Sequence, residues 1–151
     1  YEIPVSKKTM LGGASILMGL LLSVHYFLGI FFVNYFTSLG WKDYGSALGL
    51  SLLLLVGGVI LFGYERFGNA AILGFIVGNV IDRAIICALY SSYIALGTMV
   101  VPIMSSLIMA VVWYKNREVQ DLKKPYLLMV LVLVLLIIVH PKLVEGPMWP
   151  W

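Results

Sequence analysis

Long apolar runs fill almost the whole chain and are separated only by short stretches of polar or turn-forming residues. Each run is close to the roughly 20 residues that an α-helix needs to cross the hydrocarbon core of a bilayer. The pattern predicts about five transmembrane helices, with limits near 10–36, 46–64, 69–91, 96–114 and 122–141. Residues 91–97 fit either a loop or a continuing helix, and the second alternative would reduce the count to four.

The composition places this pattern in a membrane rather than in a soluble core. Hydrophobic residues make up 62% of the 151 residues and charged residues only 11%, with a mean hydropathy of +1.01. Such a chain has too little polar surface to cover a soluble globule. We therefore expect an all-α integral membrane protein, a single transmembrane helical domain over residues 1–151, with no soluble catalytic domain and no nucleic-acid partner.

The positive charges are distributed unequally between the two ends of the predicted helices. With five spans, the N-terminus, the turn at 65–68 and the loop at 115–124 share one side of the membrane. That side carries seven basic residues, namely Lys7, Lys8, Arg66, Lys115, Arg117, Lys123 and Lys124. The other side carries only Lys42 and Lys142. By the positive-inside rule we expect a multi-pass protein of the cytoplasmic (inner) cell membrane, with a retained first span, a cytoplasmic N-terminus and an external C-terminus.

The most informative polar residues lie inside the third predicted helix, in the stretch GFIVGNVIDR. Asn79, Asp82 and Arg83 stand at i, i+3 and i+4 and share one helix face. A charge near the bilayer centre costs roughly 2.5–3.5 kcal/mol, so this face should turn inward and find partners. Adjacent helical side chains point about 100° apart, so we expect Asp82 and Arg83 to pair across the bundle or with a partner chain, not with each other. Asn34 is assigned to the same polar cluster.

Two histidines are the candidate ligands for a cofactor. His25 lies slightly beyond the middle of the first predicted helix, and His140 lies near the outer end of the fifth. Together they could ligate a haem or, with Asp82, a transition metal. The alternative is that each histidine forms one interhelical hydrogen bond or lies in the headgroup layer. The single cysteine, Cys87, excludes an internal disulfide and a cysteine-based metal cage.

The stretch GFIVGNVIDR resembles the bacterial lipoprotein signal peptidases (signal peptidase II), small polytopic aspartyl peptidases with a G-N-x-x-D-R motif on their third helix. Gly78, Asn79, Asp82 and Arg83 match this motif. A second stretch, KDYGSA, is similar to the family's basic-N-x-G-A-A segment just before the second helix. The resemblance implies that Asp82 is one member of the catalytic aspartate pair, with Asn79 and Arg83 as supports.

The chain departs from this family at the second catalytic aspartate, which the resemblance places at the start of the fourth helix. No acidic residue stands between Arg83 and Lys115. In the KDYGSA stretch, Asp43 replaces the family's asparagine, and it is the candidate second carboxyl if the chain is a peptidase. An aspartyl mechanism needs two carboxyls that share a proton, because one must activate water while the other protonates the leaving group.

The first functional hypothesis is a non-catalytic polytopic subunit of a larger membrane complex, respiratory or oxidase-like, whose partners are the lipid bilayer and other membrane subunits. It rests on the incomplete site and on glycines spaced for close helix packing, among them Gly12, Gly19, Gly74 and Gly78. The alternative is an intramembrane aspartyl peptidase of the lipoprotein signal peptidase type, centred on Asp82. The second alternative is a membrane subunit that binds haem or a metal through its histidines.

Overall fold

The computed structural model describes residues 6–33, 38–90, 97–116 and 124–144. They form α1 (Lys7–Leu28), the π-helical segment η1 (Gly29–Val33), α2 (Ser38–Ile60), α3 (Glu65–Tyr90), α4 (Gly97–Asn116) and α5 (Lys124–Leu143). Each of the five α-helices is long and apolar enough to cross a membrane. The predicted number of helices is therefore confirmed: the described residues form helices and no strands, and five of the helices have the length and composition of membrane spans.

The start of the second helix differs from the prediction. α2 begins at Ser38, whereas the sequence pattern predicted a loop there and a helix only from residue 46. The segment reads locally as a turn because it contains glycines, and a glycine costs a helix about 1 kcal/mol relative to alanine. Packing accounts for the longer helix, since a Cβ at Gly45 would lie 3.0 Å from Pro141 in α5. Asp43 consequently belongs to α2 and is buried.

The other helix limits lie close to the predicted ones. The first helix passes into η1, which ends at Val33, so the predicted end at residue 36 and the candidate Asn34 lie outside the described residues. α4 begins at Gly97, and residues 91–96 also lie outside the described part of the chain. Pro102 is inside α4, where the sequence allowed either an N-terminal turn or a kink.

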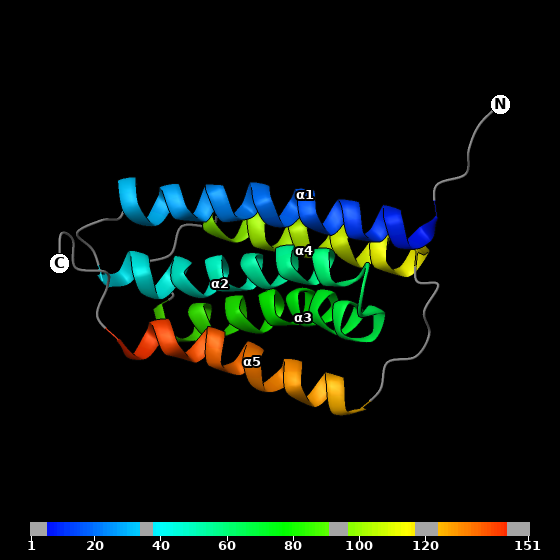
Figure 1. The fold of residues 1–151 in the computed structure, drawn as a ribbon. Helices are drawn as coiled ribbons and strands as arrows, with labels where there is room; N and C mark the ends of the chain where they lie inside the picture. The colour runs from blue at the N-terminus through cyan, green and yellow to red at the C-terminus, as the bar shows by residue number, and fades with distance from the viewer. Residues whose placement is uncertain (1–5, 34–37, 91–96, 117–123, 145–151) are drawn as a thin grey trace.

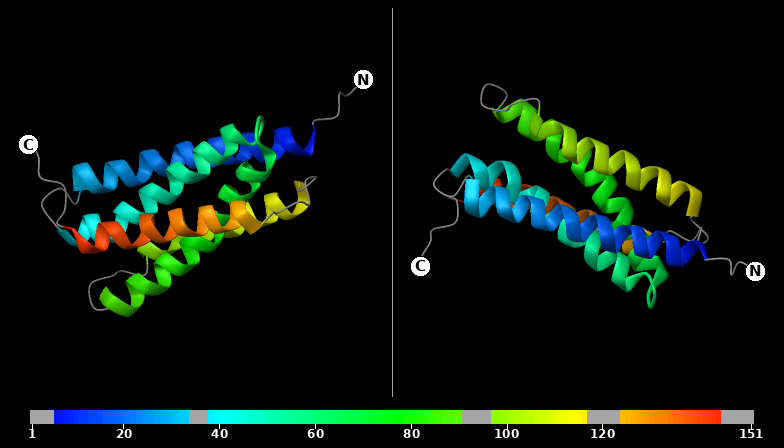
Figure 2. Two further views of the ribbon diagram at one scale, coloured as in Figure 1. Left: turned by 60° about the horizontal axis from the view of Figure 1, so that its bottom comes forward. Right: turned by 90° about the horizontal axis from the view of Figure 1, so that it is seen from above.

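Two helices form the centre of the bundle. α2 packs against α1, α3 and α5, and α3 packs against α2, α4 and α5. Figure 1 shows α1 and α5 on opposite sides of the layer made by α2 and α3, with α4 beside α1. Seen from above, α4 lies at the edge of the bundle (Figure 2). Of the apolar span of α2, 56% is buried, whereas only 22% of the span of α4 and 22% of the span of α5 are buried.

Glycines allow each central helix to pack closely against a flanking helix. A Cβ at Gly19 of α1 would lie 2.7 Å from the backbone nitrogen of Leu55 in α2. In α3, a Cβ at Gly74 would lie 2.5 Å from the side chain of Val130 in α5. The predicted small-residue faces thus allow close packing, as such faces do in membrane helices. Their neighbours at these two positions are helices of the same chain.

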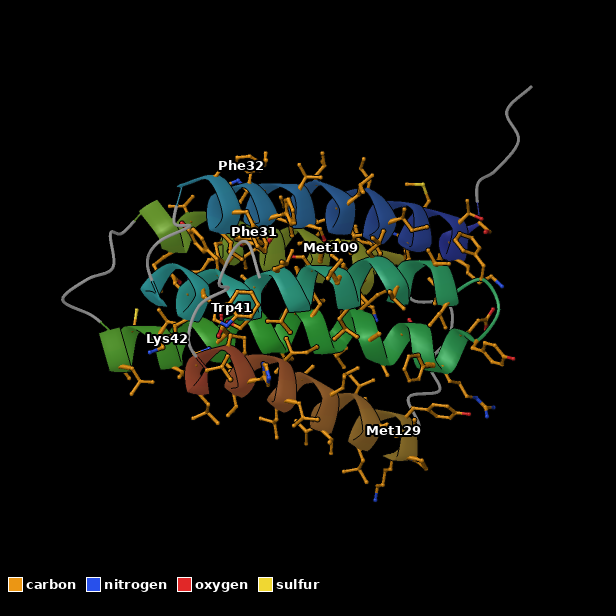
Figure 3. The ribbon with its side chains drawn as sticks, turned by 60° about the vertical axis from the view of Figure 1, so that its left-hand side comes forward. Phe31, Phe32, Trp41, Lys42, Met109 and Met129 are labelled. Atoms are coloured by element: carbon orange, nitrogen blue, oxygen red, sulfur yellow. The ribbon has the colours of Figure 1, made fainter. Side chains whose placement is uncertain are left out.

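The outer surface of the bundle is apolar. Figure 3 shows the side chains of Phe32 and Met129 pointing away from the helices, and they are 74% and 58% exposed, whereas Met109 is fully buried. The core inside is also apolar and includes Leu50, Leu54 and Phe75. A protein that is apolar both inside and outside suits lipid as its solvent, and its buried polar groups then require internal partners.

Candidate functional site

A buried group of charged and polar side chains joins three helices near one end of the bundle. This charged cluster consists of Asp43 and Ser46 from α2, Asp82 and Arg83 from α3, and Lys142 from α5. Asp82 is fully buried, and Arg83 and Asp43 are only 2% and 8% exposed. The sequence prediction that the polar face of the third helix turns inward is confirmed for Asp82 and Arg83.

The Asp82 carboxylate accepts hydrogen bonds at both oxygens. Its Oδ1 accepts from the Ser46 hydroxyl at 2.7 Å and from the Lys142 ammonium at 2.6 Å. Its Oδ2 accepts from Nη2 of Arg83 at 2.7 Å. Two of the three donors are cations, so the carboxylate is both hydrogen-bonded and charge-compensated, which is the condition for burying a charge at bearable cost.

The Arg83 guanidinium connects the two carboxylates. Nη1 donates to Oδ1 of Asp43 at 2.6 Å, and Nη2 donates to the backbone carbonyl of Asp43 at 2.7 Å as well as to Asp82. The expectation that Asp82 and Arg83 do not pair with each other is therefore wrong. Their Cα–Cβ bonds diverge, but the long arginine side chain turns back and brings one Nη to its neighbour. The fork geometry of guanidinium suits this double role.

Lys142 is the charged member of the cluster that the sequence did not predict; Ser46 is the neutral one. The sequence pattern placed it outside the membrane as a loop cation, but its side chain is only 7% exposed and its ammonium also donates to the carbonyl of Ile138 at 2.8 Å. A lysine just beyond an apolar run usually extends toward the headgroups. One signal was available: Asp43 and Asp82 together need a second cation besides Arg83 to balance their charge.

Asn79, the other described residue of the predicted polar cluster, is not part of the charged cluster. Asn79 is 2% exposed, and its amide donates to the carbonyl of Pro102 in α4 at 3.4 Å. It therefore links α3 to α4, although it shares a helix face with Asp82 and Arg83. Ser106 of α4 adds a similar long contact, from its hydroxyl to the carbonyl of Ile76 at 3.4 Å. Polar groups thus tie α3 to α4 as well as to α2 and α5.

The two candidate histidines lie on the outer surface of different helices. His25 and His140 are both exposed, on α1 and α5, which flank the central layer on opposite sides (Figure 1). The ring of His25 packs edge-on against Tyr26 at a centroid distance of 5.1 Å. Within the described residues, no three histidine, cysteine or acidic side chains form a group that could hold a metal ion. Cys87 is exposed, with its Sγ 3.9 Å from the sulfur of Met99.

The geometry brings Asp43 and Asp82 to one guanidinium, but as two separate ion pairs. An aspartyl dyad works when the two carboxyls share a proton and one of them is free to take a proton from water. Here Arg83 binds both carboxylates and Lys142 binds Asp82 as well.

No protein-family model matches the sequence, and no curated protein or solved structure matches it either. The arrangement itself is therefore the basis for a function.

Proposed function

We propose that this chain is a non-catalytic polytopic membrane protein that serves as a subunit of a larger membrane assembly, and that its charged cluster is a structural clamp. The observation that carries the non-catalytic part is the pairing of both buried carboxylates with cations, Asp82 with Arg83 and Lys142, and Asp43 with Arg83. A carboxylate held in this way is a poor general base, because its proton-accepting oxygens already accept hydrogen bonds from cations.

A clamp is a reasonable use of these charges. Two carboxylates and two cations balance, so the cluster carries no net charge. It joins α2, α3 and α5 through contacts between residues that are at least 36 positions apart in the sequence. Breaking a buried ion pair by removing one partner leaves an uncompensated charge, and the cost is about 3–5 kcal/mol in soluble proteins. The cluster therefore fixes the rotation and register of three helices relative to each other.

The surface available to a partner chain is the outer face of α4. The glycine faces of α1 and α3 contact α2 and α5 at Gly19 and Gly74, so they are already used inside the chain. α4 packs mainly against α3 and α1. Its outward side exposes Met104, Leu107 and Val111. α5 is equally exposed, but Lys142 ties it to the charged cluster, whereas α4 contributes no residue to that cluster.

The assembly is tested by native mass spectrometry of the protein extracted in mild detergent from its own membrane, with an optical and metal scan of the same sample. We expect recovery with other chains in a defined stoichiometry. Leu107→Trp on the exposed face of α4 should remove those chains, whereas the matched Leu136→Trp on α5 should keep them; the two leucines are 56% and 61% exposed. A lone monomer from the native membrane, or equal effects of the two tryptophans, would contradict the subunit proposal.

An intramembrane aspartyl peptidase is the second candidate, because Asp43 and Asp82 converge on Arg83. In this proposal Asp43 takes the place of the missing second aspartate. When substrate binds, the cations withdraw and one of the two aspartates takes up a proton from solvent. The carboxylate that remains accepts a proton from the attacking water, and the protonated aspartate donates its proton to the amine that leaves as the peptide bond breaks.

Cleavage of a lipid-modified prolipoprotein by the protein reconstituted in liposomes tests the peptidase directly. An active peptidase loses cleavage with Asp43→Asn and with Asp82→Asn, and keeps it with Glu65→Gln, which removes a half-exposed carboxylate at the other end of the bundle. Absence of cleavage by the unaltered protein excludes this candidate. Both substitutions also break a buried ion pair, so the circular dichroism of each variant is measured beside its cleavage, and loss of cleavage supports the peptidase only for a variant that remains folded.

A further inference from the structure

Two buried polar groups in and beside the charged cluster have no hydrogen-bond partner among the described residues. One is Nε of Arg83, whose two Nη atoms bind Asp43 and Asp82. The other is the hydroxyl of Tyr26 in α1. Both side chains are enclosed, with exposed fractions of 2% for Arg83 and 1% for Tyr26. Buried polar groups in folded proteins are nearly always hydrogen-bonded to protein or to ordered water, so both groups require a partner.

Tyr26 reaches the charged cluster from a helix that supplies none of its members. The ring of Tyr26 packs against the ring of Tyr44 at a centroid distance of 5.7 Å, and Tyr44 follows Asp43 in α2. The charges of Arg83, Asp82 and Asp43 all act on the Tyr26 hydroxyl, so it lies within electrostatic range of the three groups. A hydroxyl from α1 is thus placed beside a cluster that α2, α3 and α5 supply.

The chemistry of the two groups selects a small neutral ligand. The Nε–H of an arginine only donates, whereas a phenol hydroxyl donates or accepts. A water molecule satisfies both groups, because its oxygen accepts a hydrogen bond from Nε–H and one of its own hydrogens is donated to the phenol oxygen. The two carboxylates and two cations of the cluster already balance, so an anion would leave an uncompensated charge inside the bundle.

The position is close to the end of the bundle, where water is available. Tyr26 lies in the last turn of α1, and Asp43 lies in the second turn of α2. Ser23, three residues before Tyr26 and on the same helix face, adds a buried hydroxyl that also has no partner in the described part of the chain. Buried waters in proteins occupy polar positions of this kind, where they make about three hydrogen bonds to groups that lack other partners.

We propose that an ordered water molecule bridges Nε of Arg83 and the hydroxyl of Tyr26, and so links α1 to the charged cluster. The cluster then connects four helices, three by direct contacts and α1 through the water. The proposal does not depend on whether the cluster is a clamp or a peptidase site, because Nε of Arg83 binds neither carboxylate.

Hydroxyl-radical labelling in an X-ray beam tests for the water, because radicals formed from a bound water oxidise the side chains that touch it. The full-length protein in an uncharged detergent is irradiated, and the oxidised residues are identified by mass spectrometry. After correction for intrinsic reactivity, we expect Tyr26 to be oxidised several times faster than Phe75, which is an equally buried aromatic side chain in the core of α3. Equal rates at the two residues would overturn the proposal.

Tyr26→Phe gives a change in stability whose sign depends on the water. If the water is bound, the substitution removes one hydrogen bond, and the equilibrium constant of unfolding in mixed micelles should rise about fivefold, the equivalent of about 1 kcal/mol. If the hydroxyl is unpaired, its removal should leave stability unchanged or increase it, and either result would overturn the proposal. Tyr64→Phe is the matched control, since Tyr64 is 76% exposed and its hydroxyl should contribute little. Equal losses in the two variants would also overturn the proposal.

Contact of the water with Arg83 is tested by NMR of the protein labelled with ¹⁵N at arginine. The chain contains only three arginines, and Arg66→Lys and Arg117→Lys identify the Nε–H signal of Arg83 by elimination. We expect a cross-relaxation peak between this Nε–H and water, with the sign that marks close contact rather than proton exchange. Absence of that peak in the unaltered protein would overturn the assignment of the water to Arg83.

Discussion

The two ion-pair regions of this protein have similar geometry and very different surroundings. In the charged cluster, the ammonium of Lys142 lies 2.6 Å from Asp82, and the two side chains are 7% and 0% exposed. At the opposite end, Lys8 lies 3.0 Å from Glu65, with side chains that are 32% and 39% exposed. A short distance is common to both pairs. Because the two pairs differ in burial, removing one partner should lower the free energy of unfolding by different amounts: solvent can replace a lost partner at the exposed pair but not at the buried one.

The two regions also differ in connectivity. Asp82 receives donors from α2, α3 and α5, so its neighbours are fixed in three directions. The Lys8–Glu65 pair joins only α1 and α3 and forms part of the wall of a cavity. A closed, neutral cluster is suited to holding helices together, whereas solvent reaches the exposed pair at the opposite end. The experiments below are arranged by the size of the effect that this contrast predicts.

Asp82→Asn should give the largest loss of stability. The substitution leaves Lys142 and Arg83 buried with only one carboxylate between them, and we expect the free energy of unfolding to fall by about 3 kcal/mol. Reversible unfolding in mixed detergent micelles, followed by circular dichroism, measures the change. The double variant Asp82→Asn with Lys142→Gln should recover part of the loss, because it removes the uncompensated cation together with the carboxylate. No recovery would mean that Lys142 and Asp82 are not coupled.

A substitution without charge extends the contrast between buried and exposed positions to packing. Gly19→Ala places a Cβ 2.7 Å from the backbone nitrogen of Leu55, which cannot move away as a side chain could, so we expect a loss of about 2 kcal/mol. Gly13→Ala on the same helix meets no atom within 4 Å and should change stability by less than about 1 kcal/mol. The same unfolding assay compares them. Equal effects would show that α1 does not pack against α2 at Gly19.

Ser46→Ala tests whether the charged cluster depends on its neutral member. The hydroxyl donates to Asp82 at 2.7 Å inside the bundle, and a buried hydrogen bond to a charged group contributes about 1.5 kcal/mol. Two cations still bind the carboxylate after the substitution, so we expect a loss of about 1 kcal/mol in the unfolding assay, smaller than that of Asp82→Asn. A loss as large as that of Asp82→Asn would mean that Ser46, rather than the cations, determines the cluster.

Glu65→Gln should have the smallest effect on stability. Solvent and detergent headgroups reach this pair, and exposed ion pairs contribute from zero to about 1 kcal/mol, so we expect a change below about 0.5 kcal/mol. Raising the salt concentration should reduce even this difference, because salt screens exposed charges much more than buried ones. Unfolding measured at two salt concentrations checks both statements, and a large, salt-independent loss would contradict the assignment of Lys8 and Glu65 to an exposed region.

The number of helices and the inward direction of Asp82 and Arg83 could be predicted from the sequence. Both follow from local properties, since an apolar run must match the bilayer thickness and a charge must avoid lipid wherever its helix packs. The same local reasoning failed where glycines near Gly45 were read as a turn, because the packing of Pro141 against α2 is not visible along one helix.

Which charged groups pair with one another depends on the tertiary structure. Lys142 and Asp82 are separated by 60 positions in the chain, and Arg83 and Asp43 by 40, so each contact depends on how separate helices are rotated and staggered. An apolar helix gives few local signals of its rotation, because a lipid-facing side and a core-facing side contain the same residue types. The charge balance of the cluster and the cavity at the opposite end both depend on how the five apolar helices are rotated against one another in the packed bundle.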